Sequence, residues 1–67
     1  MKVQGIIFNA GDKFQLGDDS SVYTFINTTM NKKYGFEELV ASNEFGGTSE
    51  FRIDNMESLG LFITKVF

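Results

Sequence analysis

The sequence predicts one small domain, residues 1–67, of the mainly β class, folded as a compact antiparallel barrel. Two observations predict it. Short segments rich in β-branched and aromatic residues alternate with turns rich in Gly, Asn and Asp, which is typical of antiparallel strands. The chain is also too short for more than one hydrophobic core, although 42% of its residues are hydrophobic and ten are Phe or Tyr.

The first half of the chain contains three predicted strands. Residues 2–8 form the first, and Gly5 inside it indicates a bulge or a tight bend. Residues 13–16 alternate polar and apolar side chains, which predicts a short strand or one arm of a wide loop. Residues 21–29 have the strongest β-forming composition of the chain and predict the third strand.

The segment from residue 34 to residue 47 predicts a helix of about ten residues. Phe36, Leu39 and Val40 lie at helical spacing, and a pair of glycines follows as a stop signal. A strand is the alternative, because alternation would place Tyr34, Phe36, Glu38 and Val40 on one face. The strand alternative places Glu38 among those apolar neighbours.

The last third of the chain predicts two more strands. Residues 49–53 alternate strictly and indicate a half-buried strand, and residues 55–58 predict a helical turn or a plain connection. Residues 58–67 are the most hydrophobic run and predict a central strand with apolar side chains on both faces. Phe62 then needs cover from the helix or from another subunit, so Phe62→Ala should cost several kcal/mol or break an oligomer.

The order strand, strand, strand, helix, strand, strand is that of a five-stranded OB-type barrel with a short helix between strands 3 and 4. An SH3-like barrel is the alternative, because both are compact antiparallel barrels that local patterns do not distinguish.

The inventory of reactive side chains argues against an enzyme. The chain has no Cys and no His, so carboxylates, hydroxyls and lysines are the remaining candidates, and no catalytic, metal-binding or cofactor-binding motif is present. Asp18 and Asp19 are interpreted as a solvated turn rather than a cation site. No signal peptide and no apolar run long enough to span a bilayer is found, which predicts a cytoplasmic protein without membrane contact.

Aromatic residues beside basic ones are the pattern that indicates a function. Single-stranded nucleic acid is bound in this way, because bases stack on rings while cations follow the phosphates. The predicted nucleic-acid-binding residues are Lys13, Phe14, Tyr23, Phe25, Lys32, Lys33, Tyr34 and Arg52.

Two further segments resemble the gene V-type single-stranded DNA-binding proteins of filamentous phages. Residues 22–25 form a Val-Tyr-Thr-Phe strand after a polar Gly-Asp-Asp-Ser loop, and residues 58–65 lead from a turn through Gly60 into an apolar strand. The resemblance implies an OB-type barrel that dimerises and coats single strands, with Tyr23 and Phe25 on or near the binding face. That family is generally basic, whereas this chain carries a net charge of −3.

The sequence therefore predicts a non-catalytic protein that binds single-stranded nucleic acid, as a homodimer, from a phage or another mobile element. The alternative is a small acidic interaction module or inhibitor that binds a basic partner protein. The acidic residues expected to act in that case are Asp18, Asp19, Glu37, Glu38 and Glu44.

Overall fold

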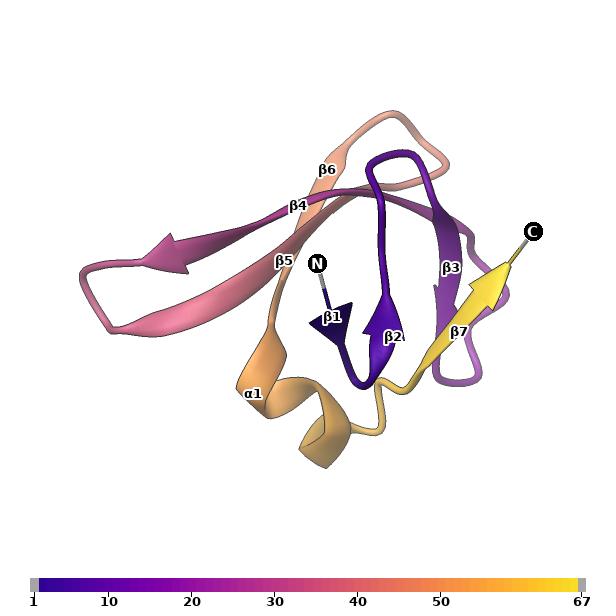
Figure 1. Cartoon of the computed structure of the whole chain (residues 1–67). Coiled ribbons are helices and arrows are strands. Elements are labelled where there is room, and N and C mark those ends of the chain that lie inside the picture. The colour runs from indigo at the N-terminus through magenta and orange to yellow at the C-terminus, as the bar shows by residue number, and fades with distance from the viewer. Residues whose placement is uncertain (1, 67) are drawn as a thin grey trace.

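A curled five-stranded antiparallel sheet is the main feature of the computed structural model, which describes residues 2–66 (Figure 1). The strands lie in the order β6-β5-β4-β3-β7, and a separate pair, β1-β2, forms a second small sheet. The elements in chain order are β1 (Lys2–Val3), β2 (Ile6–Ile7), β3 (Lys13–Leu16), β4 (Tyr23–Asn31), β5 (Phe36–Ser42), β6 (Thr48–Arg52), α1 (Ile53–Met56), the 3-10 turn η1 (Glu57–Leu59) and β7 (Ile63–Val66).

The segment of residues 2–8 is a tight hairpin rather than one strand. β1 and β2 pair antiparallel, with Val3 opposite Ile6, and Gln4 and Gly5 form the two-residue turn between them. Both turn residues have positive φ, 52° and 75°, as a type I′ turn requires. The tight bend predicted at Gly5 is therefore confirmed, whereas the single strand is wrong.

The helix predicted within residues 34–47 is wrong, and the strand alternative is confirmed as β5. The turn before β5 explains the difference. The side-chain oxygen of Asn31 accepts hydrogen bonds from the N–H groups of Lys33 and Tyr34, at 3.1 and 3.2 Å, and Gly35 has a φ of 74°. The chain reverses there and β5 pairs with β4 along its whole length, a long-range contact that overrides the helical spacing.

The distal half of the β4–β5 hairpin extends away from the rest of the molecule (Figure 1). We call residues 29–38 the arm; its strands pair Thr29 with Glu38 and Asn31 with Phe36. A β-bulge at Ile26 separates the arm's register from the proximal pairing of Phe25 with Ala41. Such a bulge bends and twists a strand, which is how one long hairpin serves both the sheet and the arm.

The helical segment α1–η1 lies between β6 and β7, which are the fourth and fifth strands of the large sheet. The helical turn predicted around residues 55–58 is confirmed, although it begins at Ile53 and no side chain caps its N-terminus. The helix expected between the third and fourth predicted strands, residues 21–29 and 49–53, is absent from the described chain, because the strand β5 lies between β4 and β6.

β7 is an edge strand, so the prediction of a central strand at the C-terminus is wrong. It pairs with β3, and its exposed edge is capped by the side chain of Gln4. The Gln4 amide donates to the carbonyl of Leu61 at 2.9 Å and accepts from the N–H of Ile63 at 2.8 Å. Phe62 precedes the strand and is 56% exposed, so the predicted cover by a helix is wrong, and cover by another subunit stays a prediction. Phe67 lies outside the described residues.

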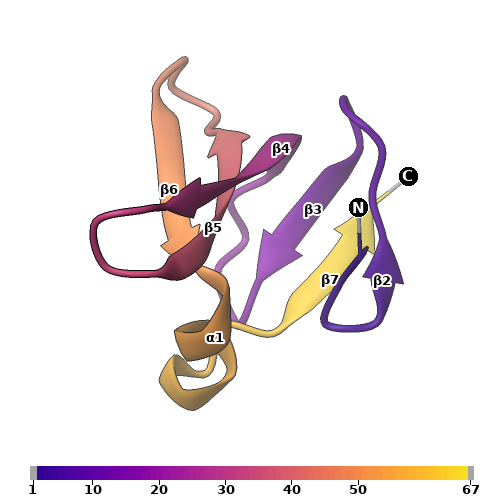
Figure 2. The same ribbon diagram turned by 60° about the vertical axis from the view of Figure 1, so that its left-hand side comes forward.

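The hydrophobic core lies between the curled sheet, the β1–β2 hairpin and α1 (Figure 2). Its buried side chains are Val3, Phe8, Phe14, Leu16, Phe25, Leu39, Ala41, Met56 and Ile63. Among the described strands, β6 and β7 do not pair with each other, so the sheet is not closed into a barrel. No helix within residues 2–66 is long and apolar enough to cross a membrane.

Candidate nucleic-acid interface

Two of the predicted stacking residues belong to the core. Phe14 and Phe25 are fully buried, and both rings pack against Phe8, at centroid distances of 5.4 and 5.1 Å. A ring that is enclosed on all sides cannot stack on a base, so the prediction that these two residues bind nucleic acid is corrected. Phe14 follows the basic Lys13 because side chains alternate across the sheet, with the lysine outside and the ring inside.

Tyr23 is half-buried and has a packing role. Its ring lies 5.6 Å from that of Phe14 and 5.5 Å from that of Phe51. Burial raises the pKa of the Tyr23 hydroxyl, and the nearby carboxylates of Asp19 and Glu44 raise it further. The environment of Tyr23 is therefore apolar on its faces and negative at its tip, which does not suit a polyanion.

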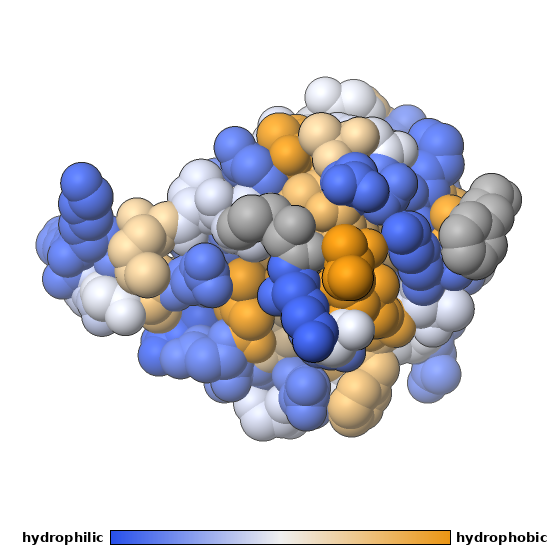
Figure 3. Space-filling view, in the orientation of Figure 1, coloured by the Kyte–Doolittle hydropathy of each residue, from blue (hydrophilic) through white to orange (hydrophobic). Residues whose placement is uncertain are grey.

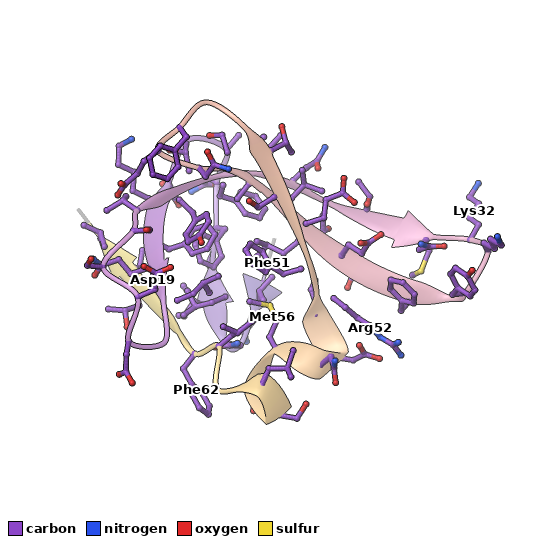
Figure 4. All side chains as sticks on the ribbon, turned by 180° about the vertical axis from the view of Figure 1, so that it is seen from behind. Asp19, Lys32, Phe51, Arg52, Met56 and Phe62 are labelled. Carbon is purple, nitrogen blue, oxygen red and sulfur yellow. The ribbon has the colours of Figure 1, made fainter. Side chains whose placement is uncertain are left out.

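The arm and its base bring together the remaining predicted residues except Lys13. Lys32, Lys33 and Tyr34 form the turn at the tip, and all three are exposed. Arg52 ends β6 beside the base of the arm, opposite Glu38 in the strand pairing. Figure 4 shows Lys32 at the far end of the arm and Arg52 below it.

Two neighbouring rings with a cation at each end lie along the arm. The Lys33 ammonium lies 5.2 Å from the centre of the Tyr34 ring, which lies 6.0 Å from the Phe36 ring with only 10° between their planes. The Arg52 guanidinium covers Phe36 at 4.4 Å from its centroid. We call these four residues, Lys33, Tyr34, Phe36 and Arg52, the aromatic stack.

Phe36 was missed as a functional residue, although the strand alternative contained the signal. The strand alternative placed Tyr34 and Phe36 on one face. In the structure Tyr34 lies in the turn and Phe36 begins β5, and the two rings are neighbours across Gly35. On a helix the same two residues would point in different directions.

A carboxylate fixes the guanidinium at the base of the stack. Asp54 accepts two hydrogen bonds from Arg52, one from Nε at 2.6 Å and one from Nη2 at 3.1 Å. This bidentate pair lowers the pKa of Asp54 and raises that of Arg52. Asp54 therefore holds the Arg52 guanidinium over the Phe36 ring and pairs with its charge.

Lys13 lies apart from the arm, on β3. Its ammonium donates to the hydroxyl of Thr24 at 3.3 Å, and its position in the sheet is at the opposite end of β4 from Lys32. In Figure 3 the arm, at the left, is largely hydrophilic, whereas hydrophobic atoms gather at the centre of the face over the β1–β2 hairpin. The arm is thus a polar projection that carries its own small set of rings.

The chemistry available at the arm is binding by stacking and by charge. In the described part of the chain, no three acidic side chains lie close enough together to hold a metal ion. Comparisons of the chain with protein-family models, with curated proteins and with solved structures gave no match.

Proposed function

We propose that this protein binds single-stranded nucleic acid, without catalysis, through the arm. The observation that carries the proposal is the aromatic stack on an exposed projection. Bases stack on exposed rings with a gain of about 1–3 kcal/mol each, and lysines beside the rings attract the backbone. Tyr34 is 68% exposed, so most of its side chain is open to a ligand.

Tyr34 is the ring on which a base would stack. The Phe36 ring lies nearly parallel to it, with 6.0 Å between the two ring centres. The exposed Lys33 side chain places its ammonium 5.2 Å from the centre of the Tyr34 ring. A base can replace this flexible side chain at low cost, and the displaced ammonium is then free to contact a phosphate.

Phosphate contacts at the arm are few. Lys32 and Lys33 are available, whereas Arg52 is paired with Asp54. Two or three contacts to a single strand correspond to a slope of about −1.4 to −2.1 for the logarithm of the binding constant against the logarithm of salt concentration. The expected affinity is therefore modest and strongly reduced by salt.

The test is a titration of a fluorescently labelled oligothymidine with the protein at low salt, followed by anisotropy. Tyr34→Ala should weaken binding at least about fivefold, because it removes the stacking surface. Lys32→Glu with Lys33→Glu should abolish binding. The absence of binding by the unaltered protein at low salt would refute the proposal.

A matched control distinguishes the effect of losing the arm's lysines from the effect of a more negative net charge. Lys2→Glu with Lys13→Glu changes the net charge by the same amount, but both lysines are exposed on the body of the molecule. This variant should keep most of the affinity. Equal losses in the two double variants would show that the arm is not the binding surface.

The fold supports a revised expectation for the barrel type. The helical segment α1–η1 comes immediately before the last strand, β7, and β7 pairs with β3, the first strand of the large sheet. This arrangement is typical of SH3-like barrels, so the strand order favours the SH3-like alternative over the OB type. The resemblance to gene V-type proteins, the homodimer, the non-enzymatic character and the cytoplasmic location stay predictions.

The alternative function is binding of a basic protein partner. The acidic residues expected to bind that partner lie at two separate places in the structure. Glu37 and Glu38 lie on the arm, whereas Asp19 and Glu44 lie beside Tyr23 in the loops at the other end of β4. Recovery of one basic protein in a pull-down, together with no binding to the oligonucleotide, would favour this alternative.

A further inference from the structure

The end of the molecule opposite the arm has an acidic surface with one fully projecting ring. We call the loops of residues 17–22 and 43–47 the acidic end. They carry Asp18, Asp19 and Glu44, and Figure 4 shows Asp19 and Lys32 at opposite ends of the molecule, whose longest dimension is 32 Å. Phe45 lies at the tip of the second loop and is 91% exposed.

Phe45 is held outward by a well-ordered turn. The side-chain oxygen of Asn43 accepts hydrogen bonds from the N–H groups of Phe45 and Gly47, at 2.9 and 3.1 Å. The backbone N–H of Asn43 donates to the carbonyl of Gly47 at 2.9 Å. Because this turn fixes the backbone on both sides of the ring, Phe45 does not fold back onto the body.

The two loops of the acidic end form one surface. A carboxylate oxygen of Glu44, in the second loop, accepts a hydrogen bond from the N–H of Val22, in the first, at 2.6 Å. Asp19 accepts from the N–H of Ser21 at 2.9 Å, which lowers the pKa of its carboxyl. Both carboxylates are therefore held in place by backbone N–H groups, and the lowered pKa keeps the Asp19 carboxyl ionised around neutral pH.

The negative charge of the acidic end is not neutralised within the described chain. Residues 14–31 and 34–51 contain no Lys or Arg. Lys13 lies on the neighbouring strand, but the salt bridges formed within residues 2–66 join Arg52 to Asp54 and Lys65 to Asp12. A surface of fixed carboxylates around a projecting ring is complementary to a cationic surface with apolar side chains.

The arm of a second copy has this complementary chemistry. Its tip carries Lys32 and Lys33, and two large apolar side chains, Met30 and Tyr34, are exposed beside them. The two glutamates of the arm, Glu37 and Glu38, lie on β5 opposite Met30 and Thr29, so the positive charge is confined to the turn. We infer that the acidic end of one copy binds the arm of a second copy, with Phe45 against Met30 and Tyr34, and with the carboxylates facing the two lysines.

Such a contact is head-to-tail. It joins two different surfaces and leaves one arm and one acidic end free, so further copies add to the same chain of molecules instead of closing a two-fold dimer. The surfaces are small, and contacts of this size are weak and transient. Nucleic acid bound to an arm would occupy the same lysines and the same ring, so an oligonucleotide should compete with the association.

The test is sedimentation velocity at low salt over a range of protein concentrations, with two variants. The arm variant is Lys32→Glu with Lys33→Glu, and the end variant is Asp18→Lys with Phe45→Ala, whose two residues are exposed and accept no side-chain hydrogen bond in the described structure. The unaltered protein should show a mass that rises with concentration past that of a dimer and falls when salt is added. Each variant should stay monomeric.

A mixture of the two variants gives the decisive result. The intact arm of the end variant fits the intact acidic end of the arm variant, so an equimolar mixture should form 1:1 pairs and nothing larger. Lys2→Glu with Lys13→Glu, which matches the net charge of the arm variant, should still assemble. Melting temperatures of all variants establish that they are folded.

Three results would overturn the inference. They are a monomeric protein up to about 1 mM, a dimer that both variants retain, and a mixture that stays monomeric although the unaltered protein assembles. The association does not depend on the proposed function, because it is measured without nucleic acid. If association holds and the oligonucleotide does not bind, the proposed function alone fails.

Discussion

The arm and the body of this protein use the same residue types in opposite ways. In the body, Phe8, Phe14 and Phe25 pack ring against ring inside the curled sheet and are fully buried. On the arm, Tyr34 and Phe36 also pack ring against ring, but they do so at the surface, between two cations. One continuous hairpin, β4–β5, contributes to both regions.

The difference shows that position along a strand decides what a ring does. Near the body, the inward side chains of β5 belong to the core and are buried, as Leu39 and Ala41 are. On the arm the rings of Tyr34 and Phe36 are covered only in part, by each other and by the side chains of Lys33 and Arg52. We therefore expect substitutions in the body to change stability and substitutions on the arm to change binding.

Phe14→Ala should have the largest effect on the body. Truncation of a fully buried Phe typically costs about 3–5 kcal/mol, which is about the whole stability that a single core of this size supplies. Circular dichroism at 25 °C should show a largely unfolded protein. Phe14→Leu, which leaves a smaller cavity, should fold with a reduced melting temperature, and a fully stable Phe14→Ala would contradict the assignment of this ring to the core.

Gln4→Asn tests how the body closes its open edge. Asn tolerates the left-handed conformation of this turn residue well, but its side chain is one methylene too short to reach both Leu61 and Ile63. Two backbone groups of the β7 edge would lose their partners, with an expected cost of about 1–3 kcal/mol. Urea unfolding measures this cost, and a midpoint at or above that of the unaltered protein would show that Gln4 does not fasten the edge.

Tyr34→Ala should change stability by less than about 1 kcal/mol, because exposed cation–π contacts and ring pairs each contribute little. The same variant is expected to lose binding to the oligonucleotide, so it separates the two regions directly. Urea unfolding with the variant and the unaltered protein side by side gives the comparison. A loss as large as that of Phe14→Ala would mean that the arm and the body form one cooperative core.

Local sequence patterns predicted where the strands lie, but they did not predict which strands are neighbours in the sheet. β3, β4 and β6 were predicted within a few residues, because their alternation and composition are properties of the strand itself. β5 was mistaken for a helix because Phe36, Leu39 and Val40 lie at helical spacing, whereas in the strand Leu39 points to the opposite face from Phe36 and Val40. What decides between helix and strand is the Asn31 turn and the pairing with β4, and pairing is not visible in a single segment.

The C-terminal strand shows the same limit. Its hydrophobicity predicted a central position, but β7 lies at an edge, where the Gln4 side chain takes the place of a neighbouring strand. Nothing in residues 58–67 indicates that a glutamine near the N-terminus performs this role. Contacts between the two ends of a chain depend on the whole topology.

The candidate site was predicted in part. The basic turn at Lys32 and Lys33, with Tyr34 beside it, is a local feature and was identified from the sequence. Phe14 and Phe25 were included wrongly, since adjacency to a lysine does not reveal which face of a strand is buried. Phe45 was not considered, because its exposure depends on the Asn43 turn rather than on its neighbours in sequence.

Acid titration should produce the smallest difference between the two regions, through Asp12 in the body and Asp54 at the base of the arm. The pKa of Asp12 is lowered mainly by the N–H of Asn9, at 2.8 Å, and also by Lys65, at 3.0 Å. The pKa of Asp54 is lowered by Arg52. A carboxyl whose pKa is lower in the folded state binds protons more weakly there than in the unfolded chain.

The stabilisation from each group is therefore complete well above the unfolded value of 3.8 and is lost as the pH falls below it, through the folded pKa. The Asp12 side chain is 27% exposed and that of Asp54 is 60% exposed, so solvent and salt screen the second pair more. Unfolding free energies between pH 7 and pH 2.5 should show a weaker acid dependence for Asp12→Asn than for Asp54→Asn. The reverse order would indicate that the charges at the base of the arm, rather than those of the body, set the stability of the fold in acid.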